Sequence, residues 1–413
     1  MWRSDEELFF PNLKKETMPA LSRRQQKIQE RQKKAVAEQK KLKKESYVNQ
    51  TPFRDAERNF KSRFPEPDFS KVIDLNNVPE ESPAVVKTSL KNSLCSSHFG
   101  KTSKEAYIIT SIPGLIVIPN AFSPEAQRRL IRRCIRDYAR PPNTSNLDTH
   151  YVVPSSGLWE LHEKQVRGEC DPNYCIPKKS DKQKEQDKRC DDDSVEQKAC
   201  ADNFNPKINV QKADPPPADT VPELPPSKLI YKMRWVTLGY QYHWPTKTYH
   251  FDRRYAMPDD VSEITREVVT AVEDIGYGDW KNVYRGSDFK AEAGVVNYYQ
   301  YRDTLMGHVD RSELNMQAPL VSISFGNDCI YLIGGITRDV EPIALRLHSG
   351  DVIVMTEPCR KCFHGVPLII ENTLPEYLSA SSSVDDEADW KLYGEYMKTT
   401  RINLNIRQVF QPS

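Results

Sequence analysis

Two histidines and one aspartate have spacings that suit a shared metal ion. His308 and Asp310 come directly after a predicted strand, and in an extended chain residues i and i+2 point to the same side. His364 lies 54 residues after Asp310 and follows a second predicted strand, 351–356. We expect both strands to end at one mouth of the fold, where the three side chains can bind one ion.

Such a ligand set has a known chemistry. Two histidines and one carboxylate on one face of a metal are the ligands of non-haem Fe(II) oxygenases, and they leave coordination positions open. The open positions suit a bidentate 2-oxo acid and O2. A histidine near an aspartate is by itself more often an ordinary polar pair, so the interpretation needs a second group of residues.

The segment 401–407 supplies that second group. Its alternation predicts a strand with Arg401, Asn403, Asn405 and Arg407 on one face and apolar residues on the other. A buried row of this kind is costly unless an anion lies against it, and arginine binds carboxylates through two parallel hydrogen bonds. The alternative is that the polar row is the solvent face of an edge strand.

The elements that must position these residues are mostly short strands. Strands are predicted at 114–118, 235–242, 293–301, 319–325, 328–333, 343–348, 351–356, 365–370 and 401–409. Ser123 before Pro124 and Glu125 predicts the start of a helix that reaches Tyr138, and helical spacing predicts a second helix over roughly 260–275. Many short strands separated by turns indicate a sandwich or jelly roll.

Two polar stretches interrupt this pattern. Residues 1–50 hold 13 Lys and Arg and 7 Asp and Glu, a net charge of +6. Their helix-prone part, 22–46, has few apolar residues and is expected to be solvated or disordered; a basic arm for nucleic-acid phosphates is the alternative. Residues 50–105 are predicted to be a connector with fragments that lie on the core, and order is predicted to begin near Ile112. The polar residues 164–227 are predicted to be a disordered insertion. The expected parts are an extension (1–105), the start of the core domain (106–163), the insertion (164–227) and the main core with its lid (228–413).

Composition excludes several classes. The chain has 413 residues with a net charge of +1, so its overall charge indicates no partner. The nine cysteines include one CxxC pair, Cys359 and Cys362, and no second pair at the spacing of a structural zinc site. No apolar run of about 18 residues predicts a membrane span. We expect no leader sequence and a nuclear or cytoplasmic location, with mitochondria left open.

The ordered motifs resemble the AlkB family of Fe(II)- and 2-oxoglutarate-dependent demethylases and look closest to its first-homologue branch. The motifs are WVTLGYQY at 235–242, AGVVNYY at 293–299, HVDRSEL at 308–314, the segment 320–335, HSGDVIV at 348–354 and RINLNIRQV at 401–409. The resemblance covers about 112–411 apart from the insertion. It implies an α+β fold: a double-stranded β-helix, or jelly roll, with flanking helices and a nucleotide-recognition lid.

The resemblance also implies roles for individual residues. His308, Asp310 and His364 match the iron ligands. The residues that match the 2-oxoglutarate site are Asn297, Tyr299, Arg401, Asn403 and Arg407. The residues that match the substrate side are Trp235, Tyr240, Gln241, Tyr242 and Arg338. For the aromatic residues of this set, ordinary core packing is the alternative.

The implied activity is oxidative removal of N-methyl groups from nucleic-acid bases, such as 1-methyladenosine in tRNA or N6-methyladenine in DNA. Fe(II), 2-oxoglutarate and O2 would be used, and formaldehyde, succinate and CO2 released. Ser312 departs from the acid that bacterial relatives carry there, so base recognition does not transfer. Two other functions stay open: a dioxygenase acting on protein, such as histones, and an inactive RNA-binding module.

Overall fold

The computed structural model of the chain describes residues 50–78, 82–179, 216–218, 220–381 and 389–412. The predicted helix at 22–46 and residues 180–215 of the predicted insertion lie outside these ranges. Residues from Pro52 onward form one compact unit.

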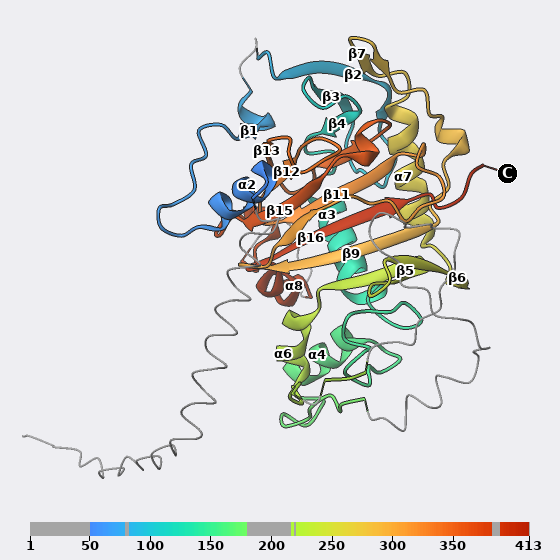
Figure 1. Cartoon of the computed structure of the whole chain (residues 1–413). Helices are drawn as coiled ribbons and strands as arrows, with labels where there is room; N and C mark the ends of the chain where they lie inside the picture. The colour runs from blue at the N-terminus through green and yellow to red at the C-terminus, as the bar shows by residue number, and fades with distance from the viewer. Residues whose placement is uncertain (1–49, 79–81, 180–215, 219, 382–388, 413) are drawn as a thin grey trace, which may run out of the picture. The chain divides into compact units, whose positions relative to one another are not determined.

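Two β-sheets that share an apolar interior form the centre of this unit (Figure 1). The smaller sheet has the strand order β1 (Ile73–Asp74), β13 (Ile343–Leu347), β12 (Cys329–Ile333), β15 (His364–Ile369) and β10 (Leu305–His308). The larger sheet has the order β2 (Val85–Leu94), β3 (Ser103–Ile109), β4 (Leu115–Ile118), β14 (Val352–Met355), β11 (Leu320–Gly326), β16 (Thr400–Arg407), β9 (Ala293–Gln300), β5 (Trp235–His243) and β6 (Thr248–Arg254). The predicted jelly-roll fold is confirmed.

Helices cover the outer faces of both sheets. α3 (Pro124–Arg132) and α7 (Asp259–Ala271) share an apolar core with the larger sheet. α2 (Pro52–Lys61) packs on the smaller sheet through Phe53, which is fully buried. α3 begins as predicted, because the Ser123 hydroxyl accepts a hydrogen bond from the Ala126 N–H. The remaining elements are the π-helical turn η3 (Arg133–Asp137), α4 (Leu158–Val166), α6 (Pro226–Leu229), α8 (Trp390–Met397), the hairpin β7 (Gly276–Tyr277) and β8 (Trp280–Lys281), and the 3-10 turns η2 (Leu75–Asn77), η4 (Ile230–Lys232), η5 (Gly286–Asp288), η6 (Cys359–Lys361) and η7 (Glu376–Leu378).

No helix in the part of the chain that the structure describes is long and apolar enough to cross a membrane.

Regular structure begins well before Ile112, so that prediction is wrong. The predicted connector 50–105 contains α2 and β2 and the start of β3, and the two strands extend the larger sheet. β2 buries only Val85, Leu90 and Leu94 of its ten residues. The other seven residues are exposed or partly exposed, so β2 has too few buried apolar residues to show the period of two from which strands are predicted.

The flanks of the predicted insertion 164–227 are also ordered. Ile176 is fully buried and pairs with Leu224 through a β-bridge. Tyr151 pairs in the same way with Lys178. The two ends of the segment therefore lie side by side on the core. The predicted insertion 164–227 thus includes ordered residues at both ends.

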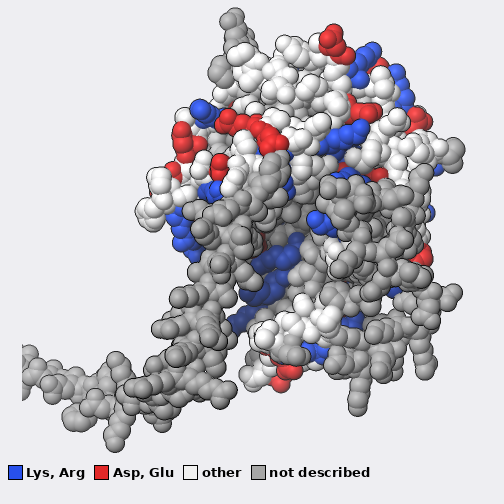
Figure 2. Space-filling view, viewed as in Figure 1, with Lys and Arg blue, Asp and Glu red and all other residues white. Residues whose placement is uncertain are grey.

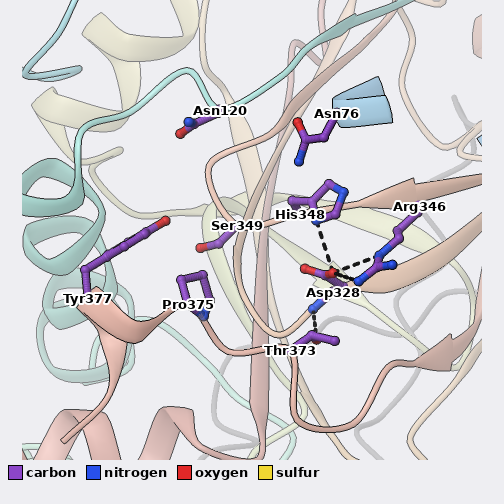
Figure 3. A pocket seen from close by; sticks show the side chains of 9 residues that line it. All are labelled: Asn76, Asn120, Asp328, Arg346, His348, Ser349, Thr373, Pro375 and Tyr377. Atoms are coloured by element: carbon purple, nitrogen blue, oxygen red, sulfur yellow. Dashed lines mark hydrogen bonds and ion pairs between the residues drawn. The ribbon is translucent and has the colours of Figure 1, made fainter. Parts of the chain in front are cut away.

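A polar cavity of about 310 Å3 lies where β13 ends and β12 begins (Figure 3). His348 lies at its edge between two carboxylates, with Nε2 2.9 Å from Asp74 Oδ1 and Nδ1 3.0 Å from Asp328 Oδ2. Arg346 binds the same Asp328 oxygen. Burial acts against a charged imidazole, but the two carboxylates outweigh it and raise the pKa of His348 to about 9. Protonated His348 therefore links Asp74 of β1 to Asp328, which directly precedes β12.

The His348 pKa predicts a pH-dependent stability. Because the pKa is raised on folding, the stabilisation is complete below the unfolded pKa of about 6.5 and is lost as the pH rises toward 9. We expect urea unfolding to show wild type losing on the order of 1 kcal/mol more than His348→Gln between pH 6.5 and 9.5, after allowance for solvent screening. Parallel losses in both proteins would contradict the assignment.

Candidate metal centre and cosubstrate site

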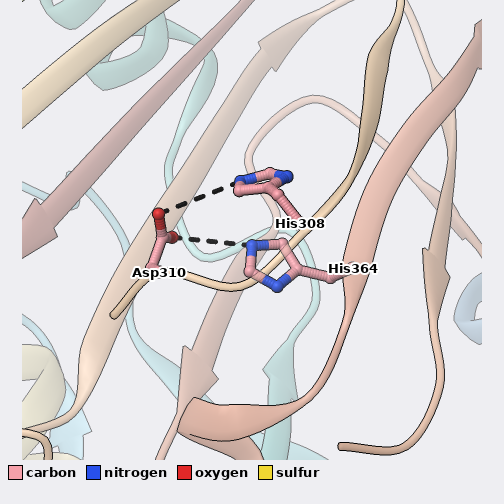
Figure 4. A group of neighbouring side chains, drawn as sticks. All are labelled: His308, Asp310 and His364. Atoms are coloured by element: carbon pink, nitrogen blue, oxygen red, sulfur yellow. Dashed lines mark ion pairs between the residues drawn. The ribbon is translucent and has the colours of Figure 1, made fainter. Parts of the chain in front are cut away.

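The antiparallel pairing of β10 and β15 brings the two histidines together. His308 is the last residue of β10 and His364 the first of β15, and they are register partners. Their ring centroids are 4.5 Å apart. Asp310 points to the same place from two residues further on, and one ligand atom from each of the three lies within 4.8 Å of the others (Figure 4). The i, i+2 spacing of His308 and Asp310 and the β10–β15 pairing thus bring together the three residues that the sequence singled out.

Backbone carbonyls fix which nitrogen of each histidine is available. The Nδ1 of His308 is 2.9 Å from the Met306 carbonyl oxygen, and the Nδ1 of His364 is 3.1 Å from that of Cys362. A carbonyl can only accept, so each Nδ1 carries the proton and each Nε2 keeps its lone pair. The Nε2 atoms face the Asp310 carboxylate at 3.9 and 3.5 Å. Such outer contacts orient metal-ligating histidines.

The protonation states also suit a cation. Burial and then the neighbouring imidazole of His364 lower the pKa of His308 to about 4. Burial acts to raise the pKa of Asp310, but Arg407 outweighs it and holds this pKa well below its usual range. At neutral pH the site therefore presents a neutral imidazole and a carboxylate. Asp310 Oδ2 is buried without a hydrogen-bond donor, a costly arrangement that a metal ion would relieve.

Helix α2 and the loop after β12 hold the residue before His308. The Gly307 N–H donates to Glu57 of α2, and the Gly307 carbonyl accepts from Arg338. A side chain at Gly307 would collide with the ring of Phe53. Arg338, expected on the substrate side, thus contacts the strand that carries a metal ligand. Glu57 had no sequence signal, because its helix was predicted to be a connector.

The predicted polar face of strand 401–407 lies inside the fold. β16 is a central strand between β11 and β9, so the alternative of an exposed edge strand is excluded. Tyr299 pairs with Arg401, and Asn297 pairs with Asn403, across β9 and β16. Paired residues share a face of the sheet. The five residues predicted at the 2-oxoglutarate site therefore form one patch of the interior face.

Arg401 is a buried guanidinium held only by neutral groups. It is 1% exposed, and it donates to the carbonyl of Asn327 at 2.7 Å and to the Ser324 hydroxyl at 2.6 Å. No carboxylate among the described residues forms an ion pair with it. A buried cation without a counter-charge is costly, and a bound carboxylate would supply that charge.

Arg407, the other arginine predicted in the 2-oxoglutarate site, forms an ion pair with a metal ligand. Its Nη2 is 2.9 Å from Asp310 Oδ1, and its Nη1 is 3.2 Å from the Tyr249 hydroxyl. Glu313 lies 3.6 Å from the same Nη1 and accepts a hydrogen bond from Tyr249 at 2.6 Å. Arg407 therefore neutralises the metal ligand Asp310 and is already engaged by carboxylates of the chain.

Arg360 completes this buried network and was missed by the sequence analysis. Its guanidinium lies 3.1 Å from Glu313 Oε2 and donates to the backbone carbonyls of Asp310 and Ala318. It is 1% exposed. Arg360 comes from the η6 turn just before His364, so it links the loops that carry two metal ligands. Its place between two cysteines gave no signal for this role.

A bulge at Gly239 decides which side chains of β5 face the site. Gly239 has φ +67°, and a side chain there would collide with the Glu292 carbonyl. Before the bulge, Trp235 pairs with Asn297 on the site face. After it, Tyr242 reaches the same side and its hydroxyl lies 3.1 Å from that of Ser312. Unbroken alternation would place Trp235 and Tyr242 on opposite faces.

The predicted lid residues then separate into three groups. Trp235 and Tyr242 pack on Trp244, with ring centroids 4.9 and 5.0 Å apart; Trp244, at the turn after β5, was not predicted. Tyr240 packs on Phe410, 5.3 Å away. Gln241 is 3% exposed, accepts from the Thr144 hydroxyl at 2.7 Å and donates to the Gly239 carbonyl at 3.0 Å, so it supports the backbone at Gly239.

The triad predicts the effect of removing its carboxylate. We expect Asp310→Ala to weaken binding of Mn(II), measured by calorimetry under nitrogen, by at least about 100-fold, because the anionic ligand is lost. Glu341→Gln, at an exposed carboxylate, is the matched control and should leave the affinity unchanged. Equal affinities in all three proteins would refute the metal site.

We expect substitutions of Arg401 and Arg407, the two arginines of β16, to weaken binding of different ligands. Arg401→Gln should weaken binding of 2-oxoglutarate to the Mn(II)-loaded protein by about 10–100-fold and spare the metal, because one charge-assisted carboxylate contact is lost. Arg407→Gln should weaken Mn(II) first, because Asp310 loses its partner. Calorimetric titration of metal and then 2-oxoglutarate separates the two. Identical profiles for both variants would contradict this division of roles.

Comparison with known proteins agrees with this site. The family model described as "2OG-Fe(II) oxygenase superfamily" matches residues 174–407. The chain is 33% identical to "Nucleic acid dioxygenase ALKBH1" of Mus musculus, over 74% of this chain and 66% of that protein. It is 32% identical to "tRNA demethylase abh1" of Schizosaccharomyces pombe (86% and 95%), and 29% identical to "DNA N(6)-methyladenine demethylase ALKBH1A" of Arabidopsis thaliana (88% and 97%).

The match to the mouse protein spans just under two thirds of that relative's length, whereas the match to the fission-yeast protein is nearly complete. The three metal ligands, Arg401 and Arg407 lie within residues 174–407, the stretch that matches the family. The chain belongs to the 2OG-Fe(II) oxygenase superfamily, which uses Fe(II), 2-oxoglutarate and O2.

Proposed function

We propose that this chain is an oxidative demethylase of nucleic-acid bases, with N-methylated adenine in tRNA as its first candidate substrate and methylated adenine in DNA as the second. One observation carries the proposal. Arg401, which has no ion pair among the described residues, lies on the same interior face of the larger sheet as Trp235, a member of the aromatic cluster Trp235–Tyr242–Trp244. Arg407 of that face forms an ion pair with Asp310 of the triad. A cofactor site beside stacked aromatic rings suits a flat base taken out of its helix.

The chain's own residues divide the work. His308, Asp310 and His364 would hold Fe(II), which with 2-oxoglutarate and O2 supplies the oxidation of the methyl group. Arg401 would bind the distal carboxylate of 2-oxoglutarate. Arg407 keeps Asp310 ionised. The oxidised methyl group would then leave as formaldehyde.

The lid would exclude water and orient the base. Burial raises the pKa of Tyr242 to about 12, so its hydroxyl stays protonated and shares a hydrogen bond with Ser312. Trp244 is 36% exposed, so part of its ring is free for stacking. Both Ser312 and Tyr242 are neutral, and the family's bacterial members carry an acid at the position of Ser312. The two hydroxyls can donate and accept hydrogen bonds at a base edge.

Basic side chains lie beside this lid. Lys and Arg side chains gather near the start of β5 (Figure 2). Lys232 is exposed two residues before Arg234, which is partly exposed and paired with Asp303 at 3.3 Å. Cations near a base pocket suit contacts to phosphates. The names of the relatives, which include a tRNA and a DNA demethylase, point to the same class of substrate.

The deciding experiment measures formaldehyde and succinate together. With Fe(II), 2-oxoglutarate and O2, we expect tRNA containing 1-methyladenosine to give formaldehyde, matched by succinate. His308→Ala should abolish both, and His98→Ala, a histidine on the β2–β3 turn, should keep both. DNA containing N6-methyladenine is the second substrate arm.

Three other results would change the proposal. Succinate without formaldehyde from either nucleic acid, but with a protein substrate, would favour a protein-directed dioxygenase. Formaldehyde from DNA alone would reverse the order of the two substrates. No succinate from any substrate, with tRNA still bound, would leave an inactive RNA-binding module.

A further inference from the structure

We propose that Cys359 and Cys362 form a reversible disulfide that releases the metal ligand His364, so that the η6 turn is a redox-sensitive modification site. The inference rests on the metal site of the proposed function and is independent of its substrate. The oxidant is a two-electron acceptor such as a peroxide. Two S–H bonds break and one S–S bond forms, and the two protons and two electrons reduce the peroxide to water or an alcohol.

The two thiols already lie across one short turn. η6 spans Cys359–Lys361, and the Cys362 N–H donates to the Cys359 carbonyl at 2.9 Å. Residues i and i+3 of a turn have Cα atoms within about 7 Å, which is inside the range that a disulfide spans. The bond can therefore form with a local movement of the turn.

That movement falls on Cys362. Cys359 is fully buried and packs tightly on the β3–β4 turn, where a side chain at Gly114 would lie 2.9 Å from Cys359 Cβ. Gly114 also holds the preceding segment, because its carbonyl accepts from the Thr356 N–H at 2.9 Å. Because Cys359 is 0% exposed and Cys362 is 9% exposed, an S–S bond of about 2.05 Å is expected to draw Cys362 toward Cys359.

The Cys362 backbone is what orients His364. Its carbonyl accepts the Nδ1–H of His364 at 3.1 Å, and that contact keeps Nε2 directed at Asp310. The same turn carries Arg360, which binds Glu313 and the Asp310 carbonyl. Tightening the turn would disturb both supports at once. Loss of one such outer contact typically weakens metal binding by about 10–100-fold.

The test starts from reduced, metal-free full-length protein, treated with hydrogen peroxide and then freed of it. Peptide mapping without reduction should find a Cys359–Cys362 crosslink lighter than the two thiols by two hydrogen atoms. Mn(II) affinity, measured by calorimetry, should fall about 10–100-fold and return with dithiothreitol. Cys362→Ser and Cys359→Ser should keep the affinity of the reduced protein after the same treatment.

Several outcomes would overturn the proposal. One is a Cys359–Cys362 crosslink that leaves Mn(II) affinity unchanged. Another is an equal loss of affinity in wild type and both serine variants, which would place the oxidation elsewhere. If the reduced wild type binds no Mn(II), the metal site of the proposed function fails as well. Failure of the nucleic-acid assay alone would leave the disulfide and its effect on the metal intact.

Discussion

The ion pair between Arg407 and Asp310 is the interaction on which the site depends. A carboxylate with a free oxygen is needed for a metal, yet a buried carboxylate without compensation would take up a proton. The Arg407 guanidinium supplies the compensating positive charge, with its Nη2 2.9 Å from Asp310 Oδ1. It is itself buried beside Glu313, which also pairs with Arg360. The charges of Arg407, Arg360, Asp310 and Glu313 balance, so this network is electrically neutral before any metal enters.

This neutral network can form only because the two sheets and their loops meet there. Arg407 comes from the larger sheet, Asp310 follows the smaller one, and Arg360 comes from the turn that leads into β15. The register of β10 and β15 places His308 opposite His364, and α2 holds Gly307 from the outer side through Glu57. A jelly roll supplies the interior face, but single contacts from flanking segments fix the ligands to it.

Residue spacing and strand alternation predict only part of the site. The spacing of His308 and Asp310 and the alternation of 401–407 gave the metal ligands and the inward polar row. Alternation could not predict the bulge at Gly239. The left-handed backbone of Gly239 breaks the alternation of β5 and so brings Trp235 and Tyr242 to one face. Nor could it reveal Glu57, Tyr249 or Arg360, whose roles arise from contacts between segments far apart in the chain. The polar edge strand β2 showed too little alternation to be recognised.

Arg401 and Arg407 illustrate the limit most clearly. They lie six residues apart on the same face of the same strand, and the alternation treats them alike. Their surroundings differ: Arg407 meets two carboxylates of the chain, whereas Arg401 meets carbonyl and hydroxyl oxygens. The positive charge of Arg407 is therefore balanced by carboxylates of the protein, whereas that of Arg401 can pair with an anionic ligand. The charges of a divalent metal and a bound dicarboxylate cancel each other. The positive charge of Arg401 adds a further attraction for an anion, so the site favours an anionic cosubstrate over a neutral one.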